Sequence, residues 1–278
     1  MNILEFTLII WFGSLVAGFL GSLTGLGGGV VIVPFLTLVF GVDIRYAIGA
    51  SLVSVIATSS GAAAAYVKEG FTNIRIGMFL EIATTMGALV GAALAARIST
   101  GIIAVVFGIV LIYSAYLSSR FKQYGPGDDH PDRLATLLRM DGIYPSLKGP
   151  MRYRVHAIPG GFGLMFIAGV LSGLLGIGSG AVKVLAMDQI MRIPFKVSTT
   201  TSNFMIGVTA AASAGVYLHR GYIEPGVAMP VMLGVLLGSL LGARVLAGAK
   251  TRILRIIFAA VILVLGIEMI YNGLTGRF

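Results

Sequence analysis

Residues 168–191 read AGVLSGLLGIGSGAVKVLAMDQIM, an almost wholly apolar stretch that holds a glycine cluster and one lysine, Lys183. A similar stretch, AGFLGSLTGLGGGVVIVPFLTLVF, occupies residues 17–40. An offset of 151 residues aligns the two, and the register continues without a gap into the segments that follow. The chain therefore contains an internal duplication of about a hundred residues, which decides how every other element is assigned. The aligned pairs are Gly18/Gly169, Gly25/Gly176, Gly27/Gly178, Gly29/Gly180, Ser51/Ser202, Tyr66/Tyr217, Gly70/Gly221, Gly87/Gly238 and Gly91/Gly242.

The composition predicts a polytopic membrane protein. The 278 residues are 57% hydrophobic and only 11% charged, and the mean hydropathy is +0.96. A soluble domain carries about 25% charged residues. Apolar segments inside lipid must satisfy their backbone groups internally, so we expect an all-α integral membrane fold. The net charge of +9 does not indicate nucleic-acid binding, because the Lys and Arg residues lie almost entirely in loops between apolar segments.

Ten apolar segments are predicted, five in each half. The second and seventh are shorter than the ~20 residues that span a bilayer. We expect them to be half-helices or the return arms of re-entrant hairpins, and the sequence leaves that choice open. The ten are 6–24, 27–40, 46–66, 76–96 and 101–117 in the first half and 159–175, 178–191, 197–218, 226–247 and 253–272 in the second.

The stretch 118–158 separates the halves and carries seven basic and four acidic residues among several Pro and Gly. We expect a solvated cytoplasmic connector with one short helix near Pro131 to Met140; the alternative is a partner-binding element. With this linker inside, fifteen of the 20 Lys and Arg residues fall on the cytoplasmic side, as positive-inside bias requires. The four basic residues that fall outside are Arg45, Arg97, Arg220 and Arg277.

This topology places both termini outside a cell inner (plasma) membrane. Each half then crosses the membrane an odd number of times, so the halves are inverted relative to each other. The predicted organisation is a first transmembrane repeat over 1–117, a cytoplasmic linker over 118–158 and a second transmembrane repeat over 159–278. Inverted repeats with interrupted helices are typical of secondary transporters, which bind substrate near the midplane between the repeats.

The two glycine clusters predict a binding site for an anion. Gly27, Gly28 and Gly29 correspond to Gly178, Ser179 and Gly180, and each set lies between a long and a short apolar segment. Glycine allows a helix to break and a ligand to approach the backbone. A helix that begins there presents free N–H groups and the positive end of its dipole. The alternative, close helix packing, is our interpretation of the G-x-x-x-G pairs Gly87/Gly91 and Gly238/Gly242.

Lys183 is the candidate for a direct contact with the anion. It lies three residues after Gly180, and its counterpart in the first half is the apolar Ile32. A charge at the centre of a membrane helix costs ~2.5–3.5 kcal/mol on insertion scales, so it needs a partner. The partner is either an anionic substrate or, in the structural alternative, a carboxylate at Glu81 or Glu268.

Polar residues at the starts of the third and eighth segments complete the candidate site. Ser51 corresponds to Ser202, and Asn203 follows directly. Their hydroxyl and amide groups can complete the hydrogen-bond shell of an anion. The alternative is a bond back to the residue's own helix, which is common for Ser in membranes.

The sequences GLGGGVVIVP at 25–34 and GIGSGAVKV at 176–184, with a polar helix start at Gly49-Ala50-Ser51, resemble the sulfite exporter TauE/SafE family. These proteins are also called toluene-sulfonate uptake permeases. The resemblance covers both halves and implies a permease for small sulfur-containing anions such as sulfite, sulfoacetate or other sulfonates. The second half departs from the pattern at Ser179, at Lys183 and at Leu185, which stands where the first half has Pro34.

We therefore expect a secondary transporter, not an enzyme, that binds a small anion between the repeats. The alternatives are a transporter of another small anion, such as a carboxylate, and a membrane receptor or scaffold that acts through the linker. The expected partners are the substrate, the lipid bilayer and a coupling ion, H⁺ or Na⁺, with Glu81 and Glu268 as candidate proton carriers. No cofactor, metal or nucleic acid is expected, and the oligomeric state is left open.

Overall fold

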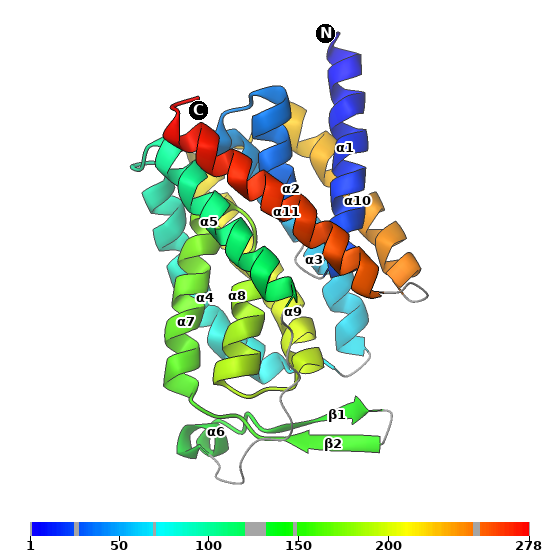
Figure 1. The fold of residues 1–278 in the computed structure, drawn as a ribbon. Coiled ribbons are helices and arrows are strands. Elements are labelled where there is room, and N and C mark those ends of the chain that lie inside the picture. Colours follow the sequence, from blue (N-terminus) through cyan, green and yellow to red (C-terminus); the bar gives the residue numbers. More distant parts are fainter. Residues whose placement is uncertain are drawn as a thin grey trace.

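The computed structural model describes residues 2–24, 28–68, 71–119, 132–146, 149–246 and 251–277, and nearly all of them are helical. Each of the ten predicted segments corresponds to a helical element (Figure 1). The first half consists of α1 (Ile3–Thr24), α2 (Gly29–Pro34), the π-helix η1 (Phe35–Val39), α3 (Ile44–Lys68), α4 (Ile74–Ala95) and α5 (Thr100–Ser119). The second consists of α7 (Ile158–Leu175), α8 (Gly180–Leu185), the π-helix η2 (Ala186–Ile190), α9 (Phe195–His219), α10 (Pro225–Leu246) and α11 (Thr251–Leu274).

The two short segments are return arms. Each consists of an α-helix of six residues continued by a π-helix of five, about half a bilayer in length at 1.5 Å per residue. Phe40, just after η1, packs edge-on against Phe6 near the start of α1, with ring centroids 5.4 Å apart. In the second half the N–H of His156, just before α7, donates to the carbonyl of Met191, just after η2, at 3.1 Å. Each short arm thus returns to the end at which the preceding long helix begins (Figure 1).

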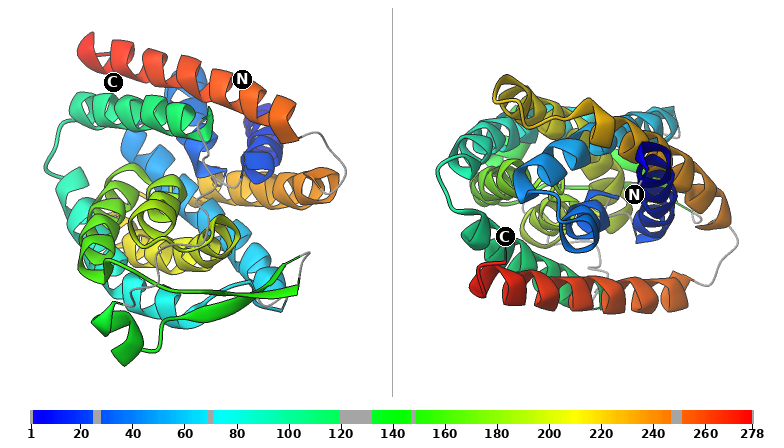
Figure 2. Two further views of the ribbon diagram at one scale, coloured as in Figure 1. Left: turned by 60° about the horizontal axis from the view of Figure 1, so that its bottom comes forward. Right: turned by 90° about the horizontal axis from the view of Figure 1, so that it is seen from above.

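The main helix pairs correspond when the two halves are exchanged. α1 packs on α10 as α7 packs on α4, α3 and α9 meet in the middle, and α5 and α11 run side by side along one edge (Figure 2). Two cation–π contacts are also related by the offset of 151 residues, which aligns Arg45 with Lys196 and Phe71 with Tyr222. Arg45 lies 5.9 Å from the ring centroid of Tyr222, and Lys196 lies 3.8 Å from that of Phe71. The duplication in the sequence is therefore present in the tertiary contacts.

Glycines bring the paired helices into direct backbone contact. A Cβ at Gly87 or Gly91 would lie 2.2 or 2.1 Å from a carbonyl oxygen of α7. A Cβ at Gly238 would lie 2.0 Å from the carbonyl oxygen of Leu15 on α1. The predicted packing role is thus confirmed for these three, whereas the surroundings of Gly242 lie outside the described residues.

Among the described residues, many large apolar side chains are exposed on the helices, as expected for contact with lipid. α4 and α7 are long and apolar enough to cross a membrane. The outward face of α4 exposes Ile82 and Met86 by 56% and 57%. Both observations agree with the membrane assignment made from composition.

Most described residues of the linker are exposed, as in a solvated connector, but the linker is also folded against the bundle. The predicted short helix is present as α6 (Arg133–Leu137), but the sequence did not predict the antiparallel hairpin of β1 (Gly142–Ser146) and β2 (Gly149–Tyr153). Three apolar linker residues are almost fully buried, and they share a cluster with residues of α4, α7, η2 and α9. They are Ala135, Met140 and Val155. The hairpin lies at the end of the bundle opposite both termini (Figure 1).

Candidate functional site

The second glycine cluster forms the turn between α7 and α8. Gly176 and Gly178 both have a φ of +68°, and Ser179 follows with a φ of +45°, a region that favours glycine. The Ser179 hydroxyl donates to the carbonyl of Ala168 at 2.6 Å, which holds this unfavourable conformation in place. The Ser179 carbonyl accepts the N–H of Lys183 at 3.1 Å and so begins α8. The predicted break in the helix is therefore present at this cluster.

The structure brings parts of the two clusters together at the centre of the molecule. The buried Ser51 hydroxyl donates to the carbonyl of Gly176 at 2.8 Å. A Cβ at Gly29 would lie 3.1 Å from the same carbonyl oxygen and 2.6 Å from Ser51 Oγ. Gly27 lies outside the described residues. The first-half residues Gly29 and Ser51 thus contact the second-half turn directly.

The remaining cluster glycines are close to neighbouring apolar side chains. A Cβ at Gly28 would lie 2.7 Å from Val235 of α10. A Cβ at Gly178 or Gly180 would lie 2.7 or 2.8 Å from Ile206 of α9. In this arrangement these glycines bring helices close together, so a large side chain at any of them would strike a neighbouring helix.

The predicted polar residues of α9 differ in their surroundings. The buried Ser202 hydroxyl donates to the carbonyl of Gly180 at 3.4 Å, so it contacts the second cluster. Asn203 is half-buried, and its backbone carbonyl accepts a hydrogen bond from Ser59 at 3.0 Å. Among the described contacts, none involves the Asn203 side-chain amide. Ser202 therefore belongs to the cluster, and Asn203 contacts α3 through its backbone.

Lys183 is fully buried and belongs to a polar network that joins three helices. Its Nζ donates to Thr209 Oγ1 of α9 at 2.5 Å. The Thr209 hydroxyl in turn donates to Glu81 Oε1 of α4 at 2.6 Å, and Thr85 donates to the same oxygen at 3.1 Å. Within the described residues Lys183 and Glu81 form no direct ion pair. The hydroxyl of Thr209 stands between the two charges.

Thr209 is a site residue that the sequence analysis missed. It is an isolated Thr within an apolar helix, and the described hydrogen bonds of its counterpart Thr58 stay within its own helix, to the carbonyls of Ser54 and Val55. Neither position has a motif that distinguishes it. Only the approach of α4 and α8 to α9 makes Thr209 the bridge between a cation and a carboxylate.

The network leaves hydrogen-bonding capacity unused. A lysine ammonium carries three N–H donors, and the described contacts of Lys183 account for one of them. Glu81 is 6% exposed, and its Oε2 has no hydrogen-bond partner among the described residues. Buried polar atoms without partners are costly, so a polar ligand that contacted these groups would be stabilised.

Glu268 does not belong to this network. It is exposed on α11, and its carboxylate accepts a hydrogen bond from Asn272 at 3.4 Å. Of the two carboxylates considered as structural partners of Lys183, only Glu81 therefore remains. The reason is that α11 packs mainly on α5 at the edge of the bundle, away from α8.

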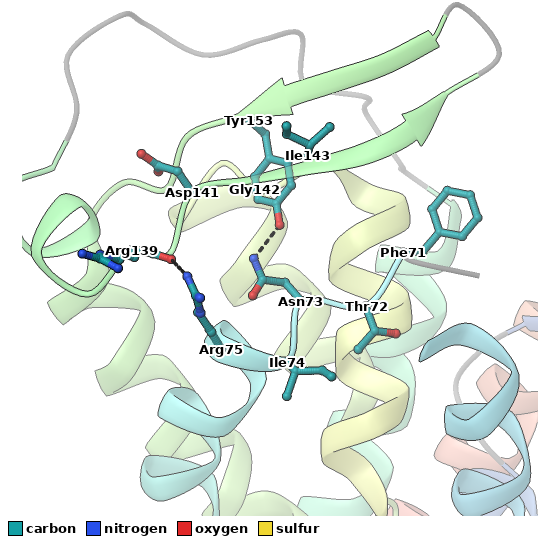
Figure 3. A pocket seen from close by; sticks show the side chains of 10 residues that line it. All are labelled: Phe71, Thr72, Asn73, Ile74, Arg75, Arg139, Asp141, Gly142, Ile143 and Tyr153. Carbon is teal, nitrogen blue, oxygen red and sulfur yellow. Dashed lines mark hydrogen bonds between the residues drawn. The ribbon is translucent and has the colours of Figure 1, made fainter. Parts of the chain in front are cut away.

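A separate cavity of about 270 Å³ lies under the linker hairpin (Figure 3). It is open to solvent and lies at the N-terminal start of α4, and Lys183 is not among its lining residues. Arg75 donates to the carbonyl of Arg139 at 3.2 Å across it. Its lining residues are Phe71, Thr72, Asn73, Ile74, Arg75, Arg139, Asp141, Gly142, Ile143 and Tyr153.

Asn73 fastens the linker to the bundle at this cavity. Its Oδ1 caps α4 by accepting the N–H of Ile76 at 3.1 Å. Its Nδ2 donates to the Met140 carbonyl at 3.1 Å and to the Tyr153 hydroxyl at 2.7 Å (Figure 3). Burial raises the pKa of Tyr153, an effect that the hydrogen bond from Asn73 opposes and the charge of Asp141 reinforces. The linker and the start of α4 thus form one hydrogen-bonded unit.

A family model of sulfite exporter TauE/SafE proteins matches residues 10–269. The chain belongs to the TauE/SafE family. The match covers both halves and the linker, so the family assignment made from the glycine clusters is confirmed. TauE/SafE membership makes the chain a membrane transporter.

Curated relatives agree with the TauE/SafE assignment. The chain is 30% identical to the probable membrane transporter protein YunE of Bacillus subtilis, over 98% of this chain and 99% of YunE. It is 25% identical to the probable membrane transporter protein MJ0441 of Methanocaldococcus jannaschii, over 92% of both chains. A probable membrane transporter protein of Xylella fastidiosa is 26% identical over 98% of both chains. No solved structure matches.

Proposed function

We propose that this TauE/SafE protein is a secondary transporter that binds a small anion at Lys183, between its two repeats. The observation that carries the proposal is the fully buried side chain of Lys183, whose three donors make one hydrogen bond among the described residues. A buried cation that retains free donors beside a break in a helix has the chemistry of an anion site. Ser51, Ser202, Gly29 and the second glycine cluster lie around the same turn and belong to this proposal.

The substrate class follows from the family name and from the chemistry of Lys183. The TauE/SafE family is described as sulfite exporters, which favours sulfur-containing oxyanions and organosulfonates such as sulfite or sulfoacetate. A lysine acts as a compact point charge with three rotatable donors, which suits a tetrahedral or pyramidal oxyanion. A carboxylate is the alternative substrate, and it requires the same cation.

We propose further that the two halves are inverted in the membrane. The termini lie at one end of the bundle and the linker hairpin at the other (Figure 1). Such halves can move relative to each other to open the site alternately to either side. The sequence-based topology assigns fifteen of the 20 Lys and Arg residues to the side of the linker, so we propose that this side is cytoplasmic and that both termini lie outside the inner membrane.

A binding screen tests the proposed function. We expect purified protein to be stabilised against heat by at least one anion among sulfite, sulfate, methanesulfonate, acetate and phosphate, because a ligand that binds only the folded state raises the melting temperature. Dimethyl sulfone, a neutral molecule of similar shape, is the matched control and should give no shift. Equal shifts with the sulfone and the anions, or no shift with any anion, would contradict the proposal.

Cysteine labelling tests the orientation. The chain contains no cysteine, so single cysteines can be placed at Leu137 on α6, which is 77% exposed, and at the exposed Asn2. We expect an impermeant maleimide to label Leu137→Cys only from the cytoplasmic side and Asn2→Cys only from outside. Labelling of both from one side would show that the halves are not inverted.

A further inference from the structure

We propose that Glu81 binds one proton for each anion bound at Lys183, so that the protein couples anion movement to proton movement. This inference rests on the proposed function. It assigns the coupling ion and the residue that carries it, and it begins from an atom that the anion site leaves unexplained. That atom is Glu81 Oε2, buried and without a partner among the described residues.

The two oxygens of the Glu81 carboxylate have unequal surroundings. Oε1 accepts hydrogen bonds from Thr209 at 2.6 Å and from Thr85 at 3.1 Å. Oε2 accepts none among the described residues. An ionised carboxylate needs acceptor contacts on both oxygens, whereas a protonated one carries a hydrogen on one of them. The unequal surroundings suit a carboxylate that gains and loses a proton at Oε2.

Charge balance makes the proton and the anion interdependent. With Glu81 ionised, the positive Lys183 and the negative Glu81 give a buried site of zero net charge. A monovalent anion beside Lys183 would add an uncompensated negative charge, which is costly in a low-dielectric interior. A proton on Glu81 restores zero net charge, and a nearby like charge favours that protonation.

Thr209 can adjust to either state because its hydroxyl has a second acceptor. The single hydroxyl proton points to Glu81 Oε1 at 2.6 Å when Glu81 is ionised. The carbonyl of Met205 lies 3.0 Å from the same hydroxyl oxygen. When Glu81 is protonated, the Thr209 proton can turn to Met205 and the oxygen still accepts from Lys183. Neither state leaves the hydroxyl unsatisfied.

Lys183 is the charged group that this network joins to Glu81. α7, which packs on α4, contains no titratable side chain. α9 also packs on α4, and its titratable residues lie at least eight residues from Thr209, or about 12 Å along the helix. These three are Lys196, Tyr217 and His219. η2 shares a buried cluster with α4 and contains the buried Asp188, but no described hydrogen bond joins Asp188 to Glu81. Among the described contacts, Lys183 is therefore the charged group that hydrogen bonds link to Glu81, through Thr209.

The same contacts disfavour Na⁺ as the coupling ion. Hard cations need several oxygen ligands and are repelled by a neighbouring cation. Glu81 Oε1 is already occupied by two hydroxyl donors, and the next group beyond Thr209 is the Lys183 ammonium. A proton needs only one oxygen.

The repeat supplies a matched control. The counterparts of Glu81, Thr209 and Lys183 at the offset of 151 are Met232, Thr58 and Ile32. The first-half set has no titratable side chain, so one proton site is expected per chain. Thr58→Val should leave coupling unchanged, whereas Thr209→Val removes the hydroxyl between the two charges and should alter it.

The test measures proton uptake when an anion binds to the purified full chain. The probes are methanesulfonate, sulfate and acetate, because none of them changes its own protonation between pH 7 and pH 8. Titration calorimetry in two buffers of different ionisation enthalpy should show uptake of about one proton per methanesulfonate or acetate bound. Affinity should fall by up to about tenfold per pH unit wherever one proton is taken up.

Glu81→Gln should bind the same anion without proton uptake and with affinity independent of pH, and Thr58→Val should behave as the unaltered chain. Two results would overturn the coupling while leaving the anion site intact. They are anion binding by the unaltered chain without proton uptake, and uptake that persists in Glu81→Gln. If none of the five anions of the binding screen binds, sulfite and phosphate included, the proposed function itself fails and the coupling fails with it. The unaltered chain alone decides the main question, so the test does not depend on Glu81→Gln folding.

Discussion

Replacing Lys183 by Met is expected to weaken anion binding by about 10- to 150-fold. The change keeps the length of the side chain and removes its charge. Loss of a charge-assisted hydrogen bond costs ~1.5–3 kcal/mol, and about 1.4 kcal/mol corresponds to a factor of ten in affinity. Lys183→Arg should recover binding only in part, because the guanidinium group is wider and differently shaped. The measurement is the dissociation constant of the anion that binds best in the screen.

The double variant Lys183→Met/Glu81→Gln separates this account from a purely structural pair. Lys183→Met alone leaves the buried Glu81 carboxylate without its cation, so we expect a lower melting temperature as well as weaker binding. The double variant should recover the melting temperature, because the unpaired charge is gone, but not the affinity. Recovery of both would make Lys183 a structural partner of Glu81. Unchanged affinity in Lys183→Met alone would rule out the assignment.

Gly173→Ala is expected to destabilise the protein more than any conservative change at the surface. A Cβ at Gly173 would lie 2.0 Å from the carbonyl oxygen of Ala88 and 2.8 Å from the backbone nitrogen of Ala92. Backbone atoms cannot rotate away, so α7 and α4 must separate. Overpacking of a close contact costs ~1–3 kcal/mol, and sometimes more. The melting temperature of purified protein should fall clearly.

Gly163→Ala is the matched control on the same helix. A Cβ at Gly163 meets nothing within 4 Å, and Ala favours a helix by up to about 1 kcal/mol over Gly. The melting temperature should therefore stay the same or rise. Equal losses in Gly173→Ala and Gly163→Ala would mean that the contact of α4 with α7 does not hold the bundle together.

The sequence predicted the helical segments well because its duplication is strong. Two stretches that share a glycine register, 17–40 and 168–191, place the helix breaks at equivalent positions in both halves. The length of the apolar segments predicted that two of them are too short to span the membrane. It did not predict the direction in which they run, since length alone does not distinguish a half-helix from a return arm. The contacts of Phe40 with Phe6 and of Met191 with His156 supply that direction.

The linker hairpin was missed because its composition resembles a loop. Gly142, Pro145 and Pro150 read as turn residues, and two short strands at an edge tolerate them. The buried residues Met140 and Val155 have no periodic pattern around them. Their burial depends on α4 and α7, which the local sequence does not contain.

The candidate site was predicted in part. Lys183 and the break at Gly178 stand out in the sequence because a charge and a glycine cluster are unusual in an apolar stretch. The sequence narrowed the protein partner of Lys183 to two carboxylates, Glu81 and Glu268. The choice between them requires knowing that α4 packs on α9 and that α11 lies at the edge of the bundle. Thr209 could be identified only from the structure, because its role depends on how α4, α8 and α9 approach one another.

The position of a bound anion tests the central claim most directly. A crystal structure with 2-bromoethanesulfonate would locate the ligand through the anomalous scattering of bromine. We expect the bromine within one side-chain length of Lys183 Nζ, with a sulfonate oxygen within hydrogen-bond distance of that nitrogen. A bromine found only in the cavity beside Arg75 and Arg139, with none near Lys183, would contradict the account.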